Sequence, residues 1–149
     1  MTSAWTDWDA PRVAAALAAD EALYLDVRTA DEFRAGHAPG AVHAPLIDAR
    51  TGAPVGAALT RALERIGHER RASPDLPVVV GCASGVRSAV ALDLLAALGV
   101  DQLVHLAEGV EGSDAGPGWR ARGLPLVGGE GPEAAGASAT PTPEPNTDG

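Results

Sequence analysis

Lysine is absent from this 149-residue chain, and all 11 basic residues are arginine. A chain without lysine cannot form a Schiff base with a carbonyl substrate, so that class of enzyme is excluded. Cys82 is the single cysteine, so no internal disulfide can form, and this fits a reducing compartment. Aromatic residues make up only 3% of the chain, and leucine, valine and alanine must therefore fill the core.

Long apolar segments are missing as well. No stretch approaches the about 18 consecutive apolar residues that a transmembrane helix needs. The first residues, MTSAWTDWDAPRV, have neither the basic nor the apolar region of a secretory signal. We therefore expect a cytoplasmic protein with no membrane partner.

The net charge of −9 argues against nucleic acid as a partner, because nucleic-acid binding depends on clustered positive charge. Because the chain as a whole is negative, any site that binds an anion must be built from positive or N–H groups close to that site. Residues 128–149 are acidic, rich in Gly, Ala and Pro, and without apolar periodicity, which predicts a disordered tail. The rest of the chain, residues 1–127, is expected to form one domain, and it contains no internal repeat.

Within that domain, helical and strand patterns alternate. Apolar runs predict buried strands, and apolar residues three or four apart predict helices. Strands are expected at Ala22–Val27, Pro77–Gly81 and Gln102–Leu106, with a short strand within residues 37–46. Helices are expected from Asp9–Pro11 onward, at residues 29–35, and at Val55–Ile66 and Ser88–Leu98. Such alternation is typical of an α/β fold with a parallel sheet between two helical layers.

The loop around Cys82 reads CASGVRS and lies between a buried strand and the next helix. Ligands of open α/β sheets bind beyond the carboxyl ends of the strands, where the first N–H groups of a helix point into the loop. Gly85 allows a tight turn, and Arg87 adds positive charge; both favour the nucleophilic thiolate form of a nearby cysteine. A lone cysteine is more often a small buried apolar residue, but this position favours a nucleophile in a surface-facing loop. The substrate-binding cradle is expected to consist of Ala83, Ser84, Gly85, Val86, Arg87 and Ser88.

This loop resembles the active-site loop of rhodanese-like sulfurtransferases. Tyr24–Leu46, with its DVR, EF and GHxPGA motifs, is similar to the first signature of that family, and Gly123–Leu126 is similar to its closing GxP. The resemblance spans Trp5–Val127 and implies a three-layer α/β fold with a mostly parallel five-stranded sheet. It also implies a cysteine that takes a sulfane sulfur from a small anionic donor, becomes a persulfide and passes the sulfur to cyanide or a thiol, including a protein thiol. Neither a cofactor nor a metal is implied.

The length of the loop separates this interpretation from a related one. Rhodanese-fold phosphatases and arsenate reductases place five residues between the cysteine and the arginine, which makes room for a tetrahedral oxyanion. Here four residues separate Cys82 from Arg87, and the next position is Ser88. The tighter loop fits a sulfur atom better than a phosphoryl group.

Arg28 and the histidines have competing interpretations. Arg28 is a candidate substrate-binding residue that could attract an anionic donor, but an ion pair with Glu32 is the commoner role for such a residue. His37 is expected to be structural and to hydrogen-bond the Pro39–Gly40 turn. The other histidines have no cysteine or carboxylate at ligand spacing, so no zinc site is predicted; they are His43, His68 and His105.

One segment departs from the family. The family usually has two glycines and then a tryptophan, whereas this chain has Glu108–Gly109 and a longer stretch, residues 110–118, before Trp119. We expect that stretch to be a surface loop that borders the site. The resulting hypothesis is a sulfurtransferase with Cys82 as persulfide carrier. The alternative is a rhodanese-fold module that binds a partner or senses redox state without turnover.

Overall fold

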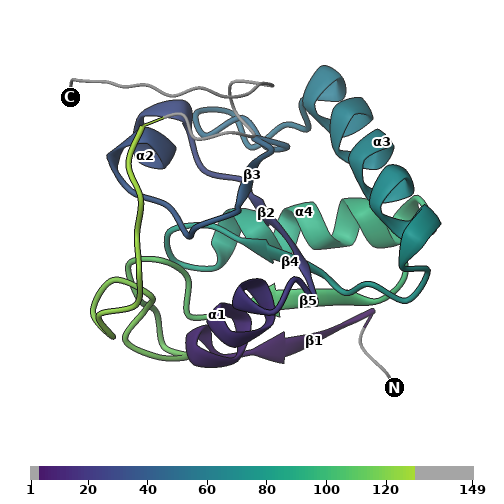
Figure 1. Cartoon of the computed structure of the whole chain (residues 1–149). Helices are drawn as coiled ribbons and strands as arrows, with labels where there is room; N and C mark the ends of the chain where they lie inside the picture. The colour runs from purple at the N-terminus through teal and green to yellow at the C-terminus, as the bar shows by residue number, and fades with distance from the viewer. Residues whose placement is uncertain (1–3, 130–149) are drawn as a thin grey trace.

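The computed structural model describes residues 4–129, and five short strands form one sheet across it (Figure 1). The strands are β1 (Trp5–Trp8), β2 (Leu23–Asp26), β3 (Val42–His43), β4 (Val78–Gly81) and β5 (Leu103–Leu106). Their spatial order is β1-β5-β4-β2-β3, and every neighbouring pair is parallel. The three central strands are buried along their whole length, as expected for a sheet covered on both faces.

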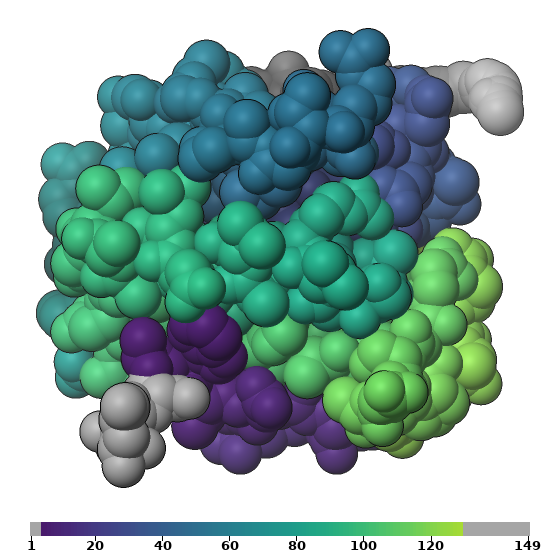
Figure 2. All heavy atoms as spheres, turned by 180° about the vertical axis from the view of Figure 1, so that it is seen from behind, coloured from purple at the N-terminus to yellow at the C-terminus, as the bar shows by residue number. Residues whose placement is uncertain are grey.

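Four helices cover the two faces of the sheet. They are α1 (Ala10–Ala18), α2 (Ala30–Ala35), α3 (Gly56–Ala72) and α4 (Val86–Ala97). The apolar residues of α3 and α4 pack with alternate residues of β2, β4 and β5 in one core cluster. On the opposite face α1 and α2 pack with the remaining strand residues and with Trp119. Figure 2 shows the face covered by α3 and α4, with the N-terminal residues along its lower edge.

The sequence-based fold class is confirmed, with differences at the ends of elements. The edge strand β1 was not predicted from the residue pattern, because WTDW is short and its two central residues are exposed. Helix α3 continues past Ile66 to Ala72, and α4 begins at Val86 instead of Ser88. The predicted tail lies outside the described residues except for Gly128 and Gly129.

The register of the strands brings the site together. Asp26, the last residue of β2, is paired with Gly81, the last residue of β4. Because the strands are parallel, both carboxyl ends lie at one edge of the sheet, where the loops that follow them meet. No helix within residues 4–129 is long and apolar enough to cross a membrane.

Candidate active site

The sulfur atom of Cys82 lies in a turn of backbone amides. The Gly85 amide donates a hydrogen bond to Sγ at 3.1 Å, and the Ser88 amide donates another at 3.3 Å. Gly85 is the N-cap of α4 and no side chain caps that helix, so the cysteine sulfur accepts the bond that a capping oxygen usually accepts. Amide donors in this position favour negative charge on an acceptor, and Cys82 as the nucleophile stays a prediction.

Cys82 is buried, with 1% of its surface exposed, and this corrects the expectation of a surface-facing thiol. The strand β4 ends at Gly81, and the residue after it still packs into the core cluster between the sheet and α4. Within the loop, Ser84 and Val86 are exposed, while Ala83 and Gly85 are half-buried. Any reagent must therefore reach the sulfur past the exposed part of the loop.

Two glycines allow the loop to pack tightly against the segment that follows β5. Gly85 has a φ of +91°, and a Cβ there would lie 2.6 Å from the Ala107 carbonyl oxygen. Gly109 has a φ of +74°, and a Cβ there would lie 2.3 Å from the Ala83 carbonyl oxygen. A side chain at either position would push the two segments apart.

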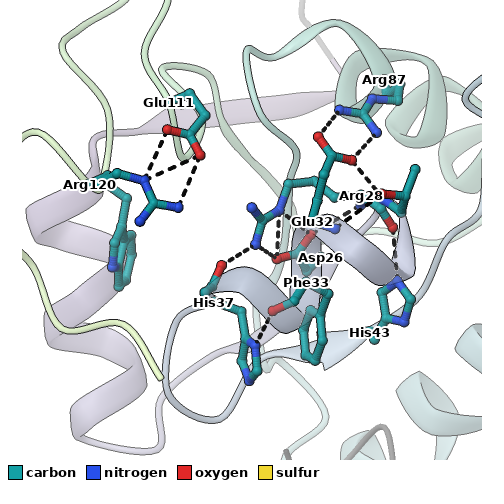
Figure 3. Close-up of polar contacts among 12 residues, drawn as sticks. Asp26, Arg28, Glu32, Phe33, His37, His43, Arg87, Glu111 and Arg120 are labelled. Atoms are coloured by element: carbon teal, nitrogen blue, oxygen red, sulfur yellow. Dashed lines mark hydrogen bonds and ion pairs between the residues drawn. The ribbon is translucent and has the colours of Figure 1, made fainter. Parts of the chain in front are cut away.

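Arg87 is held by a carboxylate on another helix. Its Nη1 and Nη2 donate to the two oxygens of Glu32 at 2.8 and 3.1 Å (Figure 3). Glu32 also accepts from the Thr29 amide at 2.9 Å in a capping box at the start of α2. The hydrogen bond from Arg87 is the main cause that lowers the pKa of Glu32 to about 2. The positive charge expected at the loop is thus largely balanced by Glu32.

The prediction of an ion pair between Arg28 and Glu32 is wrong. Arg28 is 1% exposed; its guanidinium contacts Asp26, with Nη2–Oδ2 at 2.8 Å, and donates to the Gly36 carbonyl at 2.7 Å (Figure 3). The pair forms because Asp26 ends a buried strand and its carboxylate needs a charged partner there. Arg28 as a substrate-binding residue stays a prediction, and its contacts point to a role in holding β2 to the end of α2.

His37 has a structural contact, although not the one predicted. Its Nδ1 lies 2.7 Å from the carbonyl oxygen of Phe33, and its ring stacks on the Phe33 ring with centroids 3.6 Å apart (Figure 3). Burial lowers the pKa of His37. The His43 ring also stacks on the Phe33 ring, with centroids 4.7 Å apart. Its Nε2 lies 2.8 Å from the carbonyl oxygen of Arg28. In residues 4–129 no three His, Cys, Asp or Glu side chains are placed to hold a metal ion.

Through Ser88, which the sequence placed in the cradle, the site extends to His105 and Asp7, which the sequence did not indicate. The Cys82 thiol donates to Ser88 Oγ at 3.3 Å, and Ser88 Oγ lies 2.7 Å from His105 Nε2. His105 Nδ1 is 3.8 Å from the carboxylate of Asp7. His105 is 23 positions after Cys82 and Asp7 is near the start of the chain, so only the strand order could bring them together.

The segment that departs from the family supports the loop directly. The amides of Val110 and Glu111 each donate at 2.9 Å, to the carbonyls of Cys82 and Ala83 respectively. This confirms that the segment borders the site. Most of residues 111–117 are exposed, and Glu111 forms an ion pair with Arg120 (Figure 3).

Glu108, which stands where the family has a glycine, anchors the same segment. Its buried carboxylate accepts from the amides of Ala10 and Gly118 and from Arg122 Nε, at 2.7, 2.8 and 2.9 Å. Burial acts to raise the pKa of Glu108, but the hydrogen bonds, led by that from Arg122, outweigh it and lower the pKa. Residues 110–118 therefore begin from a fixed point beside α1.

A family model for the rhodanese-like domain matches residues 9–115 of this chain. The chain belongs to the rhodanese-like family. That match includes both the Cys82 loop and the segment with Arg28 and His37. No curated protein matches the chain in a sequence search.

Solved structures with the rhodanese fold resemble the chain over most of its length. Rv0390 from M. tuberculosis is 25% identical with a TM-score of 0.63, covering 85% of this chain and 100% of that one. The thiosulfate sulfurtransferase from Pseudomonas aeruginosa is 25% identical with a TM-score of 0.58, covering 85% of this chain but only 21% of that one. A Rhodopseudomonas palustris protein described as a possible tyrosine phosphatase is 21% identical with a TM-score of 0.51, covering 83% and 85%.

The chain thus spans about a fifth of the length of the P. aeruginosa sulfurtransferase. The likeness to the R. palustris protein shows the fold alone. Because proteins with one fold can have unrelated activities, the function must be argued from the Cys82 loop.

Proposed function

We propose that this rhodanese-like domain is a sulfurtransferase that carries sulfur as a persulfide on Cys82. The observation that supports this most directly is the pair of amides, from Gly85 and Ser88, that donate to Sγ. Such donors stabilise a thiolate before the reaction and again when it leaves, and they need no cofactor. The four-residue spacing to Arg87 supports sulfur over a phosphoryl group as the transferred species.

In the first half-reaction, the Cys82 thiolate attacks the outer sulfur of a donor. A bond from Sγ to that sulfur forms, and the bond from the sulfur to the rest of the donor breaks. The donor remnant, sulfite in the case of thiosulfate, leaves with the bonding electron pair. A protein persulfide is another candidate donor and leaves as a thiolate. Mercaptopyruvate is a third; its single sulfur is attacked, and pyruvate leaves as its enolate.

In the second half-reaction, a nucleophilic acceptor such as cyanide or a thiolate attacks the outer sulfur of the persulfide. The bond from Sγ to that sulfur breaks, and Cys82 leaves as the thiolate. The amides of Gly85 and Ser88 receive the negative charge that returns to Sγ. The amides of Ala83, Ser84, Val86 and Arg87 belong to the predicted cradle as well, and their contact with the transferred sulfur stays a prediction.

A second candidate function rests on the burial of the thiol. With 1% of Cys82 exposed and Arg87 balanced by Glu32, a free anionic donor meets little accessible positive charge at the loop. These features favour a module that binds a protein partner or senses redox state with little turnover. In that case the partner would have to move the loop to reach the sulfur.

The deciding experiment exposes the purified chain to thiosulfate, mercaptopyruvate and a protein persulfide in turn. Intact mass spectrometry then counts added sulfur, and cyanide or a thiol tests its transfer. We expect one added sulfur on Cys82, absent from Cys82→Ser. The serine hydroxyl can accept the same two amides and donate to Ser88, so the variant should remain folded. A folded wild type that takes sulfur from none of the donors would reject the sulfurtransferase and favour the binding module.

A further inference from the structure

A row of polar side chains leads from Cys82 to the edge of the sheet. Cys82 follows β4, Ser88 lies in the first turn of α4, His105 is on β5 and Asp7 is on β1. The heavy-atom distances along the row are 3.3 Å from Sγ to Ser88 Oγ, 2.7 Å to His105 Nε2, and 3.8 Å from Nδ1 to Asp7 Oδ1. The contacts thus form one continuous row that connects the end of β4, α4, β5 and β1.

The strand register explains why the row is continuous. Asp7 is paired with His105 across β1 and β5, and Val80, two residues before Cys82, is paired with His105 across β4 and β5. Side chains two residues apart on a strand share a face, so these groups all lie on the face that α4 covers. Because β1 is an edge strand, the row ends at the border of the molecule, where the N-terminal residues lie in Figure 2.

Exposure to solvent increases along the row. Cys82 is 1% exposed and His105 is 8% exposed, whereas the Asp7 side chain is 66% exposed. The thiol is almost fully buried, and three polar groups in sequence, Ser88, His105 and Asp7, lead from it toward solvent. Ser88 is fully buried, and its hydroxyl contacts both neighbours in the row, the Cys82 thiol and the His105 ring.

The groups around His105 favour a neutral imidazole that can accept a proton. Burial lowers the pKa of His105, and the Asp7 carboxylate and the Gly85 carbonyl partly oppose this effect. Asp7 faces the ring from β1, Cys82 stands beyond Ser88 at the end of β4, and α4 presents the Ser88 hydroxyl and the Gly85 carbonyl. Trp5 contacts the ring edge-on, with centroids 6.3 Å apart.

We propose that Ser88 and His105 carry the thiol proton away from Cys82, with Asp7 as the counter-charge at the solvent end. The use of this path in sulfur transfer rests on the proposed function, but the path itself concerns only the thiol. The thiol S–H bond breaks as its proton moves to Ser88 Oγ, and the Ser88 O–H bond breaks as its proton moves to His105 Nε2. Ser88 is neutral before and after, and the products are a thiolate and an imidazolium that faces Asp7.

The same path serves the return of the proton. When the regenerated thiolate returns to the resting thiol, the imidazolium Nε2–H can give its proton back to Sγ through Ser88. No proton is gained or lost overall in this exchange. Deprotonation of a thiol with 1% exposure therefore does not require the loop to open.

The test measures alkylation of Cys82 by uncharged iodoacetamide between pH 5 and 9, which needs no sulfur donor. The variants are Ser88→Ala and His105→Gln, with His68→Gln, an exposed histidine on α3, as the matched control. We expect both site variants to react about tenfold more slowly at pH 7, the effect of losing one hydrogen bond to a charged group, and to reach half-maximal rate at higher pH. Asp7→Asn should slow alkylation by about twofold, because the carboxylate is mostly exposed. The control should follow the wild type.

A second measurement avoids variants at Ser88 and His105. NMR titration of the His105 imidazole compares the wild type with Cys82→Ser, in which no thiolate can form. We expect the midpoint at lower pH in Cys82→Ser, because the imidazolium has lost its thiolate partner. Equal midpoints, or alkylation profiles of folded Ser88→Ala and His105→Gln that coincide with the wild type, would overturn the proton path. A wild type that fails to accept sulfur but shows these shifts would reject only the proposed function.

Discussion

Arg87, in the first turn of α4, donates from both terminal nitrogens to the carboxylate of Glu32, in the first turn of α2, 55 residues earlier in the chain. The two helices lie on opposite faces of the sheet. Their N-termini meet at the edge where β2 and β4 end, and this pair joins them there. A cation in the first turn of a helix is opposed by the helix dipole, so the carboxylate offsets that cost as well as fixing the loop.

Replacing Arg87 by lysine separates its charge from its geometry. A lysine keeps the charge but cannot make the two parallel hydrogen bonds to Glu32. We expect Arg87→Lys to lose activity nearly as severely as Arg87→Ala, by about tenfold in sulfur transfer, the equivalent of about 1.4 kcal/mol. Arg61→Lys, at an exposed arginine on α3, is the control. Retention of most of the transfer rate in Arg87→Lys would show that charge alone suffices.

The same pair predicts a dependence of stability on pH. The pKa of Glu32 is about 2 in the folded protein against 4.5 for the free side chain, so the folded state favours the carboxylate. Its stabilising contribution is complete above about pH 4.5 and is lost as the pH falls from there toward 2. Thermal unfolding of Glu32→Gln should therefore show a lower Tm than wild type at pH 5–8, with the difference closing below pH 4.5. A difference that stays constant down to pH 2.5 would contradict the assignment.

Glu108 should matter for stability more than its position in a loop suggests. Its carboxylate satisfies two backbone amides and Arg122 while only 2% of the residue is exposed. Removing one partner of such a buried group costs about 3–5 kcal/mol, since the others lose their acceptor. We expect Glu108→Ala to lower the free energy of unfolding by about that amount in urea denaturation. Glu111→Ala, which removes an exposed ion pair, should change it by less than about 1 kcal/mol; equal effects would refute the anchoring role.

The residue pattern predicted the α/β class and the place of Cys82 because both depend on local signals, whereas the five-stranded sheet was implied by the resemblance. Apolar runs and helical periodicity gave the central strands and most helix positions, and the order strand–CASGVRS–helix placed Cys82 at a strand end. The amides of Gly85 and Ser88 then follow from the geometry of any helix N-terminus. Edge strand β1 was missed because half of its residues face solvent and leave no apolar pattern.

Contacts between distant segments could not be predicted in the same way. Glu32 was assigned to Arg28 because the two are four residues apart, yet its partner is Arg87 and Arg28 turns to Asp26. The burial of Cys82 and its link to His105 depend on strand order and register, which the residue pattern does not encode. His105 is two residues after Leu103 on β5, and that spacing puts both side chains on the face that α4 covers.

Gly109 gives the sharpest test of how the segment after β5 supports the Cys82 loop. Its φ is +74°, and a Cβ there would lie 2.3 Å from the Ala83 carbonyl oxygen, a backbone atom that cannot move alone. Gly123 has nearly the same φ, +73°, but nothing within 4 Å of a Cβ, so Gly123→Ala carries the same backbone strain without the collision. Gly123→Ala should lose about 1 kcal/mol of stability from strain alone.

Gly109→Ala should lose more stability than this control and should also reduce the alkylation rate of Cys82. The added methyl group must displace Ala83, and with it the amides of Gly85 and Ser88 that point at Sγ. Urea denaturation and iodoacetamide kinetics on the two variants separate the contributions. Gly123→Ala should change only the free energy of unfolding, whereas Gly109→Ala should change both that free energy and the alkylation rate of Cys82. If Gly109→Ala matches Gly123→Ala in stability and alkylates like the wild type, then the segment after β5 does not set the geometry of the loop.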